Sequence, residues 1–369
     1  MPIVTGSPAG GPLGQLYPLC DGGSAQIDSA TPYRSNWEAM MRRIASAFTT
    51  LLLLIPVTAR AEWHEREAAI MGTRISVELW HEDAGQAEAA IDAVMAEMHR
   101  IDDLMSHYKP ESQLSQINRD AATAPVKVDA ELAALIARAL EFSELSDGAF
   151  DITYASVGNL YDYREHRHPS EAQIQAALPA ISWRHVVVDR EASTVRFLMP
   201  GVRIDLGGIA KGYAVDSAAR ILQARGIRNA TVSAGGDSRI LGDRRGKPWI
   251  VGIRHPDDPN RVIARIPLED TAMSTSGDYE RYFDENGVRY HHIIDPHTGR
   301  SPVGVRSVTV IGPNATLTEG LTKSVFVMGP ERGLALIESQ DDVDAVVVRS
   351  DGRVFYSKGL APPDGGRAP

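Results

Sequence analysis

Apolar residues recur every three or four positions along residues 84–104 and again along residues 129–145. This spacing places them on one face of a helix, so each range is predicted to form an amphipathic helix that packs on a core. A further helix is predicted over residues 317–328. The methionines of the first helix, Met95 and Met98, share its apolar face, which indicates core packing rather than cofactor binding.

Alternation of apolar and polar residues predicts strands elsewhere. Helices and strands follow one another without strict alternation, and no internal repeat is visible, which favours an α+β fold over a doubly wound sheet. The small residues at 273–278 are predicted to form a turn. The predicted strands lie within residues 62–80 and at 185–189, 194–198, 230–233, 249–253, 308–311, 345–348 and 354–356.

The sequence GVRIDLGGIAKGYAVD at residues 201–216 combines a predicted strand, a turn and a helix. It predicts a short apolar strand ending at Asp205, a turn at Gly207-Gly208, and a helix that contains Lys211. Free backbone N–H groups at the positive end of such a helix can bind phosphate. The spacing fits neither a Walker loop nor a dinucleotide fingerprint. A tight connection with solvated charges explains the stretch equally well.

The N-terminal part of the chain has the pattern of an export signal. A positive segment, Met40–Arg43, precedes a short apolar run and the sequence Ala59-Arg60-Ala61. We therefore expect residues 40–61 to be a signal peptide cut after Ala61, and residues 1–39 to be a non-native, disordered upstream extension. The apolar run is short for a membrane span, and the alternative is a buried core helix.

The remaining chain is expected to be one domain, residues 62–360, followed by a disordered Pro- and Gly-rich tail, residues 361–369. The only cysteine, Cys20, precedes the predicted cleavage site. The exported protein would therefore contain no disulfide and no cysteine that could carry a lipid. Together these features predict a soluble periplasmic protein without a stable membrane span, and not a lipoprotein.

The charge balance narrows the choice of partners. The chain has 48 acidic and 38 basic residues, and it contains no basic run. A nucleic-acid partner is therefore not expected. An acidic protein that handles phosphate groups needs local cations or a metal ion to offset its own field.

Carboxylates gather beside predicted turns, where functional sites are common. Taken singly, each is better explained as a turn or capping residue. Taken together, with His291 and His292 available as proton acceptors, they suggest an anionic, metal-capable pocket for phosphoryl or nucleotidyl chemistry. These carboxylates are Asp205, Asp237, Asp278, Asp295 and Glu319.

A series of short segments, in this order, resembles the ApbE family of FAD:protein FMN transferases. The resemblance spans roughly residues 64–350, and no single segment would be specific by itself. The segments are MGT at Met71, MSHY at Met105–Tyr108, GAFDIT at 148–153, IDLGGIAKGYAVD at 204–216, SAGGD at 233–237, STSGDYER at 274–281, HIIDPHTG at 292–299 and LTKSVFVMG at 321–329.

The resemblance implies that the protein cleaves FAD at its pyrophosphate with Mg²⁺. It would attach the FMN half through a phosphoester to a Thr or Ser of a target protein and release AMP. The implied fold is a two-part α+β structure of mixed or antiparallel sheets and flanking helices, with the flavin in a cleft between the parts. The implied FAD contacts are Met71 and Tyr108 at the flavin, Ala149, Phe150 and Asp151 at the adenosine, Asp205 and Lys211 beside the cofactor, and Ile293.

His292 is the candidate catalytic base. A Thr hydroxyl is a poor nucleophile until its proton is removed, and imidazole titrates near neutral pH. Asp295 either orients this imidazole or holds the turn in which it lies. The alternative for His292 is a structural histidine at the end of a strand.

The metal motif departs from the family pattern. The family has Asp-Ala-x-x-Thr, with Asp and Thr as ligands, where this chain has Glu319-Gly320-Leu321-Thr322-Lys323. In one interpretation, Glu319, Thr322 or water, and the carbonyl oxygen of Gly208 hold Mg²⁺. In another, the ammonium of Lys323 takes part of the cation's place. Glu319 and Lys323 could also form a simple surface ion pair.

Two other functions remain open at this point. One is a Mg²⁺-dependent FAD pyrophosphatase that yields FMN and AMP, and the other is a non-catalytic periplasmic FAD-binding protein. The chain has no evident flavinylation motif of its own, so the acceptor is expected to be another protein. By resemblance, membrane subunits of electron-transfer complexes and secreted flavin carriers are the candidate acceptors.

Overall fold

A sheet of eight strands forms the centre of the structure, and every neighbouring pair in it is antiparallel. The computed structural model describes residues 62–258 and 260–360. The expected upstream extension, signal peptide and C-terminal tail lie outside the described residues. In spatial order the strands are β1 (Glu62–Ile70), β2 (Thr73–His81), β6 (Ala230–Ala234), β7 (Asp237–Leu241), β10 (Ala272–Gly277), β13 (Val305–Gly312), β14 (Asp344–Arg349) and β15 (Val354–Tyr356).

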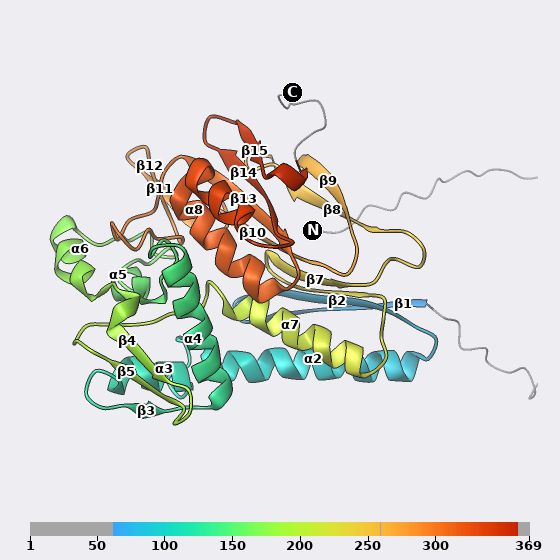
Figure 1. The fold of residues 1–369 in the computed structure, drawn as a ribbon, viewed down its shortest axis with the longest axis horizontal. Helices are drawn as coiled ribbons and strands as arrows, with labels where there is room; N and C mark the ends of the chain where they lie inside the picture. The colour runs from blue at the N-terminus through green and yellow to red at the C-terminus, as the bar shows by residue number, and fades with distance from the viewer. Residues whose placement is uncertain (1–61, 259, 361–369) are drawn as a thin grey trace, which may run out of the picture. The chain divides into compact units, whose positions relative to one another are not determined.

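Helices α2 (Ala84–Met105), α7 (Ala210–Ala224) and α8 (Ala315–Glu338) lie side by side against this sheet, with α7 in the middle (Figure 1). The helix predicted over residues 84–104 is thus confirmed, and its apolar face is buried. The helix predicted over residues 317–328 is the first part of α8, because the non-helical backbone of Gly329 interrupts the helix there.

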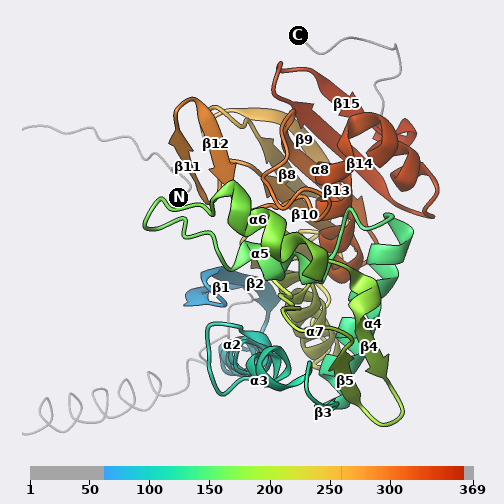
Figure 2. The ribbon, with the colours of Figure 1, turned by 90° about the vertical axis from the view of Figure 1, so that its left-hand side faces the viewer.

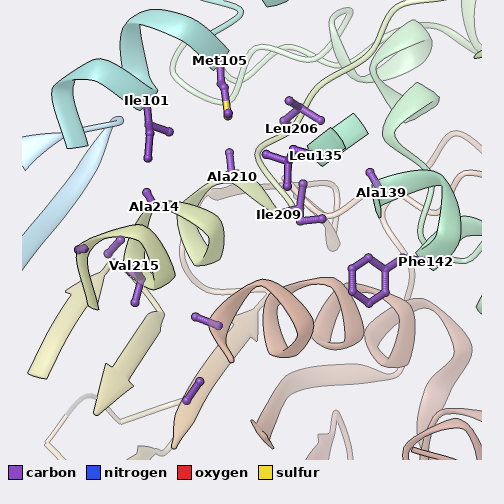
Figure 3. Packing of buried hydrophobic residues seen from close by; sticks show 14 of the residues in the cluster. Ile101, Met105, Leu135, Ala139, Phe142, Leu206, Ile209, Ala210, Ala214 and Val215 are labelled. Carbon is purple, nitrogen blue, oxygen red and sulfur yellow. The ribbon is translucent and has the colours of Figure 1, made fainter. Parts of the chain in front are cut away.

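Helices α7 and α8 cross at very short distance. Gly212 makes this possible, since a Cβ at this position would overlap the carbonyl oxygen of Ala315. On its other side α7 meets α2, where Met105 faces Ala210 and Ile101 faces Ala214 in the buried cluster (Figure 3). The start of α7 is therefore fixed from both sides.

A smaller part of short helices and a three-stranded sheet packs around the start of α7. Leu135 and Phe142 of α4 belong to the same buried cluster as Leu206 and Ile209 (Figure 3). The predicted helix at 129–145 and the predicted hairpin at 185–198 are both found here. This part contains α3 (Gln113–Asp120), β3 (Val126–Lys127), α4 (Ala130–Leu145), η1 (Ile152–Tyr154), α5 (Ala155–Gly158), α6 (Glu171–Ala177), η2 (Leu178–Ala180), η3 (Trp183–His185), β4 (Val186–Asp189) and β5 (Thr194–Phe197).

Two hairpins complete the fold, together with the short turn η4 (Lys358–Leu360). The hairpin of β8 (Trp249–Arg254) and β9 (Val262–Leu268) packs on Met273 in a separate buried cluster. The hairpin of β11 (Tyr282–Glu285) and β12 (Val288–His291) lies near α6 (Figure 2). There the ring of His168 stacks on Tyr290 with centroids 4.3 Å apart.

The strand predicted just before the Gly207-Gly208 turn is wrong. Within the described part of the chain, residues 202–206 join no sheet, because the Asn118 side chain and a carbonyl outside any strand satisfy their backbone groups. The amide of Asn118 accepts from the N–H of Ile204 at 2.7 Å and donates to its carbonyl at 2.9 Å. The N–H of Asp205 donates to the carbonyl of Ile152 at 3.0 Å. The alternation of apolar residues correctly indicated that this segment is buried, but the segment does not pair with another strand.

The turn predicted at residues 273–278 is also wrong, because most of this range is the central strand β10. Its two serines face α8, where Ser274 bonds with Thr318 at 2.8 Å and Ser276 with Thr322 at 3.0 Å. Serines in this strand serve the close approach of a helix, whereas the sequence suggested a turn.

Helices and predominantly antiparallel strands in one compact unit confirm the α+β prediction. Across residues 62–258 and 260–360, no helix combines the length and apolar character that crossing a membrane requires.

Candidate active site

Two half-buried lysines, one on α7 and one on α8, form the centre of the candidate site. Lys211 forms an ion pair with Glu319, and its Nζ lies 3.4 Å from Oδ2 of Asp237. Nζ also donates to the carbonyl of Gly207 at 2.8 Å. Burial acts against its charge, but Glu319 and Asp237 outweigh burial, so the pKa of Lys211 is raised. Lys211 is a charged group held by two carboxylates.

The side chain of Glu319, a residue of α8, reaches the N-terminal end of α7. Its Oε2 accepts a hydrogen bond from the backbone N–H of Gly212 at 2.7 Å, and its Oε1 pairs with Lys211. The side chain is fully buried, and burial raises its pKa. The expectation of an open, phosphate-ready helix start is therefore wrong in part, because a carboxylate from α8 already accepts from this end.

Lys323 lies on α8 just beyond Glu319. Its Nζ donates to Oγ of Ser276 at 2.7 Å. Ser276 donates in turn to Oγ1 of Thr322, and Thr322 donates to the carbonyl of Glu319 at 2.7 Å. Burial lowers the pKa of Lys323, while the charge of Glu319 opposes this shift. The chain of hydroxyls fixes the position of the ammonium group.

Three of the four residues expected to surround Mg²⁺, Glu319, Thr322 and Lys323, do not fit that ion. Both oxygens of Glu319 already accept bonds from the protein, and the hydroxyl of Thr322 is engaged on both sides. Lys323 brings a positive charge instead of a lone pair. Among the described residues, no three His, Cys, Asp or Glu side chains group as a metal site requires. A hard cation needs oxygen ligands that are free to face it.

His292, the candidate base, follows β12. Its backbone N–H donates to the carbonyl of Arg281 at 3.0 Å, and its buried Nδ1 has no hydrogen-bond partner in the described part of the chain. Burial lowers the pKa of His292 to about 3, and nearby positive charges, Lys323 foremost, act in the same direction. The imidazole is therefore neutral at pH 7, and in the free protein it is a weak base.

Asp295 makes the contacts of a turn residue. Its Oδ1 accepts from the N–H of His297 at 2.9 Å, and its Oδ2 accepts from the hydroxyl of Thr298 at 3.1 Å. Within the described residues, none of its hydrogen bonds reaches His292. Of the two roles left open by the sequence, these contacts favour holding the turn.

Asp205 fixes the segment that carries Tyr108. Its Oδ2 lies 3.1 Å from Nδ1 of His107, and its Oδ1 accepts from the N–H of Gly207 at 2.5 Å. Burial acts to raise the pKa of Asp205, but the bond from His107 outweighs it and the pKa is lowered. The rings of His107 and Tyr108 lie 3.9 Å apart, and Tyr108 is 77% exposed. Tyr108 is thus a free aromatic face for a planar ligand.

Met71 lies at the tip of the β1–β2 hairpin. Both turn residues have positive φ, 54° for Met71 and 67° for Gly72, as a type I′ turn requires. Arg281 donates to the carbonyl of Gly72 at 2.9 Å and ties the turn to the segment before β11. A cavity of about 390 Å³ beside the turn is lined by Ala69, Ile70, Met71, Gly72, Thr73, His99, Asp102 and Lys109.

Asp151 is fully engaged by the protein. Its Oδ1 accepts from the N–H of Thr153 at 2.8 Å and its Oδ2 from the N–H of Trp183 at 2.7 Å, and burial raises its pKa. It caps η1 and joins two segments of the smaller part. The other expected FAD contacts, Ala149, Phe150 and Ile293, are buried as well.

The structure adds residues to the site that the sequence did not single out. Ser276 holds Lys323, and His107 joins Asp205 to Tyr108. Asp237, noted only as one carboxylate among several, lies beside Lys211 with one buried oxygen lacking a partner in the described residues. Of these residues, only Ser276 could have been found from the sequence, because Ser274 and Ser276 have the spacing of side chains on one face of a strand.

Comparison with known proteins agrees with this geometry. A family model described as the ApbE family matches residues 71–347. A curated FAD:protein FMN transferase of Vibrio cholerae is 33% identical and the match covers 84% of this chain and 95% of that protein. One from Treponema pallidum is also 33% identical, with 82% and 89% covered.

Solved structures give the same result. The ApbE protein from Thermotoga maritima is 36% identical and superposes with a TM-score of 0.76, covering 81% of this chain and 98% of that one. The apo flavinyl transferase ApbE of Pseudomonas stutzeri is 28% identical with a TM-score of 0.72, covering 83% and 98%. The chain belongs to the ApbE family.

Proposed function

We propose that this protein is an FAD:protein FMN transferase, which cleaves FAD at the pyrophosphate and attaches FMN to a Thr or Ser of another protein. The observation that carries the proposal is the meeting of Lys211, Lys323 and a neutral His292 in one buried site. Cations beside an uncharged base suit the transfer of a phosphoryl group to a hydroxyl.

In this reaction His292 acts as the base. His292 accepts the proton of the acceptor hydroxyl, whose oxygen then attacks the phosphorus on the FMN side of FAD. A new P–O bond forms to the acceptor, the P–O bond of the pyrophosphate breaks, and AMP leaves. The bound pyrophosphate is an anion, so it raises the pKa of His292 above its value in the free protein and makes it a stronger base.

The two ends of FAD have separate supports. Tyr108 offers an exposed ring to the flavin, and Met71 lies at the tip of a strained hairpin beside a cavity. On the adenosine side, the buried Ala149 and Phe150 form the apolar backing of the binding surface. Ile293 follows His292 and packs on FAD near the reacting phosphates. Asp205 acts indirectly, because it positions the loop that carries Tyr108.

The acceptor is a second protein, and the transfer takes place after export. The tripartite pattern at residues 40–61 supports a cleaved signal and a periplasmic location. Sequencing the N-terminus of the protein from a periplasmic fraction tests this part. A chain beginning at Glu62 is expected, whereas a chain that retains residues 1–39 would contradict it.

The activity is tested by incubating the protein with FAD and a flavin carrier domain, and then separating the products. Fluorescent flavin covalently attached to the carrier, with AMP released, is the expected result. Free FMN and AMP without attachment would show that the protein is a pyrophosphatase. If neither covalent flavin nor free FMN forms, the protein only binds FAD. His292→Ala is expected to abolish transfer while FAD binding persists.

A further inference from the structure

Lys323 differs from the other lysine of the site in its partners. Lys211 faces two carboxylates, Glu319 and Asp237. Lys323 is half-buried like Lys211, but within the described residues no carboxylate lies at ion-pair distance from its Nζ, and its hydrogen bond goes to Ser276. A buried ammonium without an anionic partner is costly. It is explained if an anion binds there.

The side chain of Lys323 also passes beside the glycine turn at the start of α7. Its Cγ would lie 3.6 Å from a Cβ built on Gly208, so the lysine stem runs directly beside this turn. The stem therefore passes the Gly207-Gly208 turn before the ammonium reaches Ser276 of β10. This is the region in which the expected divalent ion would have to lie.

The charges of the cluster are balanced without a metal ion. Glu319 and Asp237 supply two negative charges, and Lys211 and Lys323 supply two positive ones. A divalent cation would add two positive charges next to Lys323, and it would compete for Glu319 with Lys211 and Gly212, whose N–H groups already occupy both carboxylate oxygens. Like charges at such close range repel strongly in a buried site.

We propose that Lys323 replaces the divalent cation in this protein: its ammonium binds the pyrophosphate of FAD, and the reaction needs no Mg²⁺. This inference rests on the proposed function for its substrate. During transfer, the ammonium stays protonated and neutralises the negative charge that develops on the phosphate of the leaving AMP. The proton of the acceptor hydroxyl still goes to His292, so no further reactant is required.

The first test measures FAD binding and flavin transfer by the wild-type protein, either in EDTA or with millimolar Mg²⁺. Both are expected to differ less than about twofold between the two conditions. Loss of binding or transfer in EDTA, restored by Mg²⁺, would overturn the inference. If no covalent flavin or free FMN forms under either condition, the proposed function fails, and the binding comparison still decides the role of Lys323.

The second test uses Lys323→Met, which keeps the stem and removes the charge. FAD affinity is expected to fall about 10- to 100-fold with and without Mg²⁺, which is the usual contribution of a charge-assisted hydrogen bond. Lys358→Met removes an exposed lysine far along the chain and is the matched control, with unchanged affinity. Unchanged FAD affinity in Lys323→Met would overturn the inference.

The third test measures metal binding directly, with Mn²⁺ as a paramagnetic probe. The wild-type protein with bound FAD is expected to hold no Mn²⁺ at micromolar concentration. The double variant Glu319→Asp with Lys323→Thr removes the ammonium and adds a hydroxyl, and it is expected to gain stoichiometric Mn²⁺ binding in the presence of FAD. Stoichiometric Mn²⁺ binding by the wild type would contradict the inference, even if a variant fails to fold.

Discussion

The Oε2 atom of Glu319 accepts a hydrogen bond from the backbone N–H of Gly212, so a side chain of α8 closes the start of α7. The two residues are 107 positions apart in the sequence. The helix start has no side-chain cap of its own, because Ile209 stands at the N-cap position. Glu319 therefore combines a cap with an ion pair to Lys211.

Glu319→Gln is expected to lower the free energy of unfolding by about 3–5 kcal/mol, because Lys211 would lose its closest counter-charge in a buried site. Urea denaturation followed by circular dichroism measures this change. Glu338→Gln breaks the exposed pair with Lys358 and serves as the control, with a change below about 1 kcal/mol. Equal effects of the two variants would show that the buried pair adds no stability.

Gly212→Ala is expected to destabilise the protein by about 1–3 kcal/mol, because the new methyl group would overlap the carbonyl of Ala315. Helix propensity by itself predicts the opposite sign, a gain of about 1 kcal/mol. The sign of the change in urea denaturation therefore separates close packing from propensity. The exposed Gln223→Ala on the same helix is the control for propensity.

His292→Gln is expected to change how stability depends on pH. In the folded protein the pKa of His292 is about 3, whereas in the unfolded chain it is near 6.5. Between these values the unfolded chain binds the additional proton, so stability is full above pH 6.5 and falls as the pH is lowered. The slope attributable to this group is at most about 1.4 kcal/mol per pH unit.

Urea denaturation at pH 4, 5, 6 and 7 tests this expectation. As the pH is lowered toward 4, the free energy of unfolding should fall more for the wild type than for His292→Gln. Parallel pH profiles would mean that His292 keeps an ordinary pKa in the folded protein.

Tyr108→Ala is expected to weaken FAD binding about 5- to 100-fold, the range for loss of one stacked aromatic ring. Because the side chain is 77% exposed, stability should change by less than about 0.5 kcal/mol. Quenching of flavin fluorescence on titration measures the affinity. Tyr282→Ala removes another exposed tyrosine, 40% accessible, and should leave the affinity unchanged.

Met71 and Asn286 occupy the same position in two hairpins of the same turn type. Each has positive φ, 54° and 51°, and each precedes a glycine. Asn-Gly is the favoured pair for this turn, so methionine in the first hairpin indicates a function for its side chain.

Met71→Asn is accordingly expected to weaken FAD binding at least about fivefold. Its stability should change by less than about 1 kcal/mol, because relief of backbone strain offsets the lost packing. The reciprocal variant Asn286→Met should lower stability by about 1 kcal/mol without changing FAD affinity. A loss of affinity in both variants would point to a general effect of hairpin distortion.

Helices and strands with regularly spaced apolar residues were predictable from the sequence, because this spacing directly reflects which residues are buried. The helix at residues 84–104 and the hairpin at residues 185–198 both follow from period alone. Two short segments were not predictable. Residues 202–206 are buried without a strand partner, since Asn118 replaces that partner from 86 positions away. Residues 273–278 look like a turn but pair within the sheet.

The site was predictable in its parts but not in its connections. Asp205, Lys211, His292 and Glu319 were singled out by their places beside glycine turns and by family resemblance. No pattern in the sequence indicates that Glu319 binds Lys211, or that Asp205 binds His107. Such pairings depend on how α7, α8 and β10 approach one another, which only the three-dimensional structure reveals.

The close crossing of α7 and α8 over β10 has a consequence for the protein before it meets FAD. Lys211, Ser276 and Lys323 come together only after strands distant in the sequence have paired, so an unfolded chain has no FAD site. Ligand that binds only the native state stabilises it by mass action. Each tenfold rise of free FAD above its dissociation constant adds about 1.4 kcal/mol to the free energy of unfolding. The lifetime of the folded protein is thereby linked to the local supply of its own substrate.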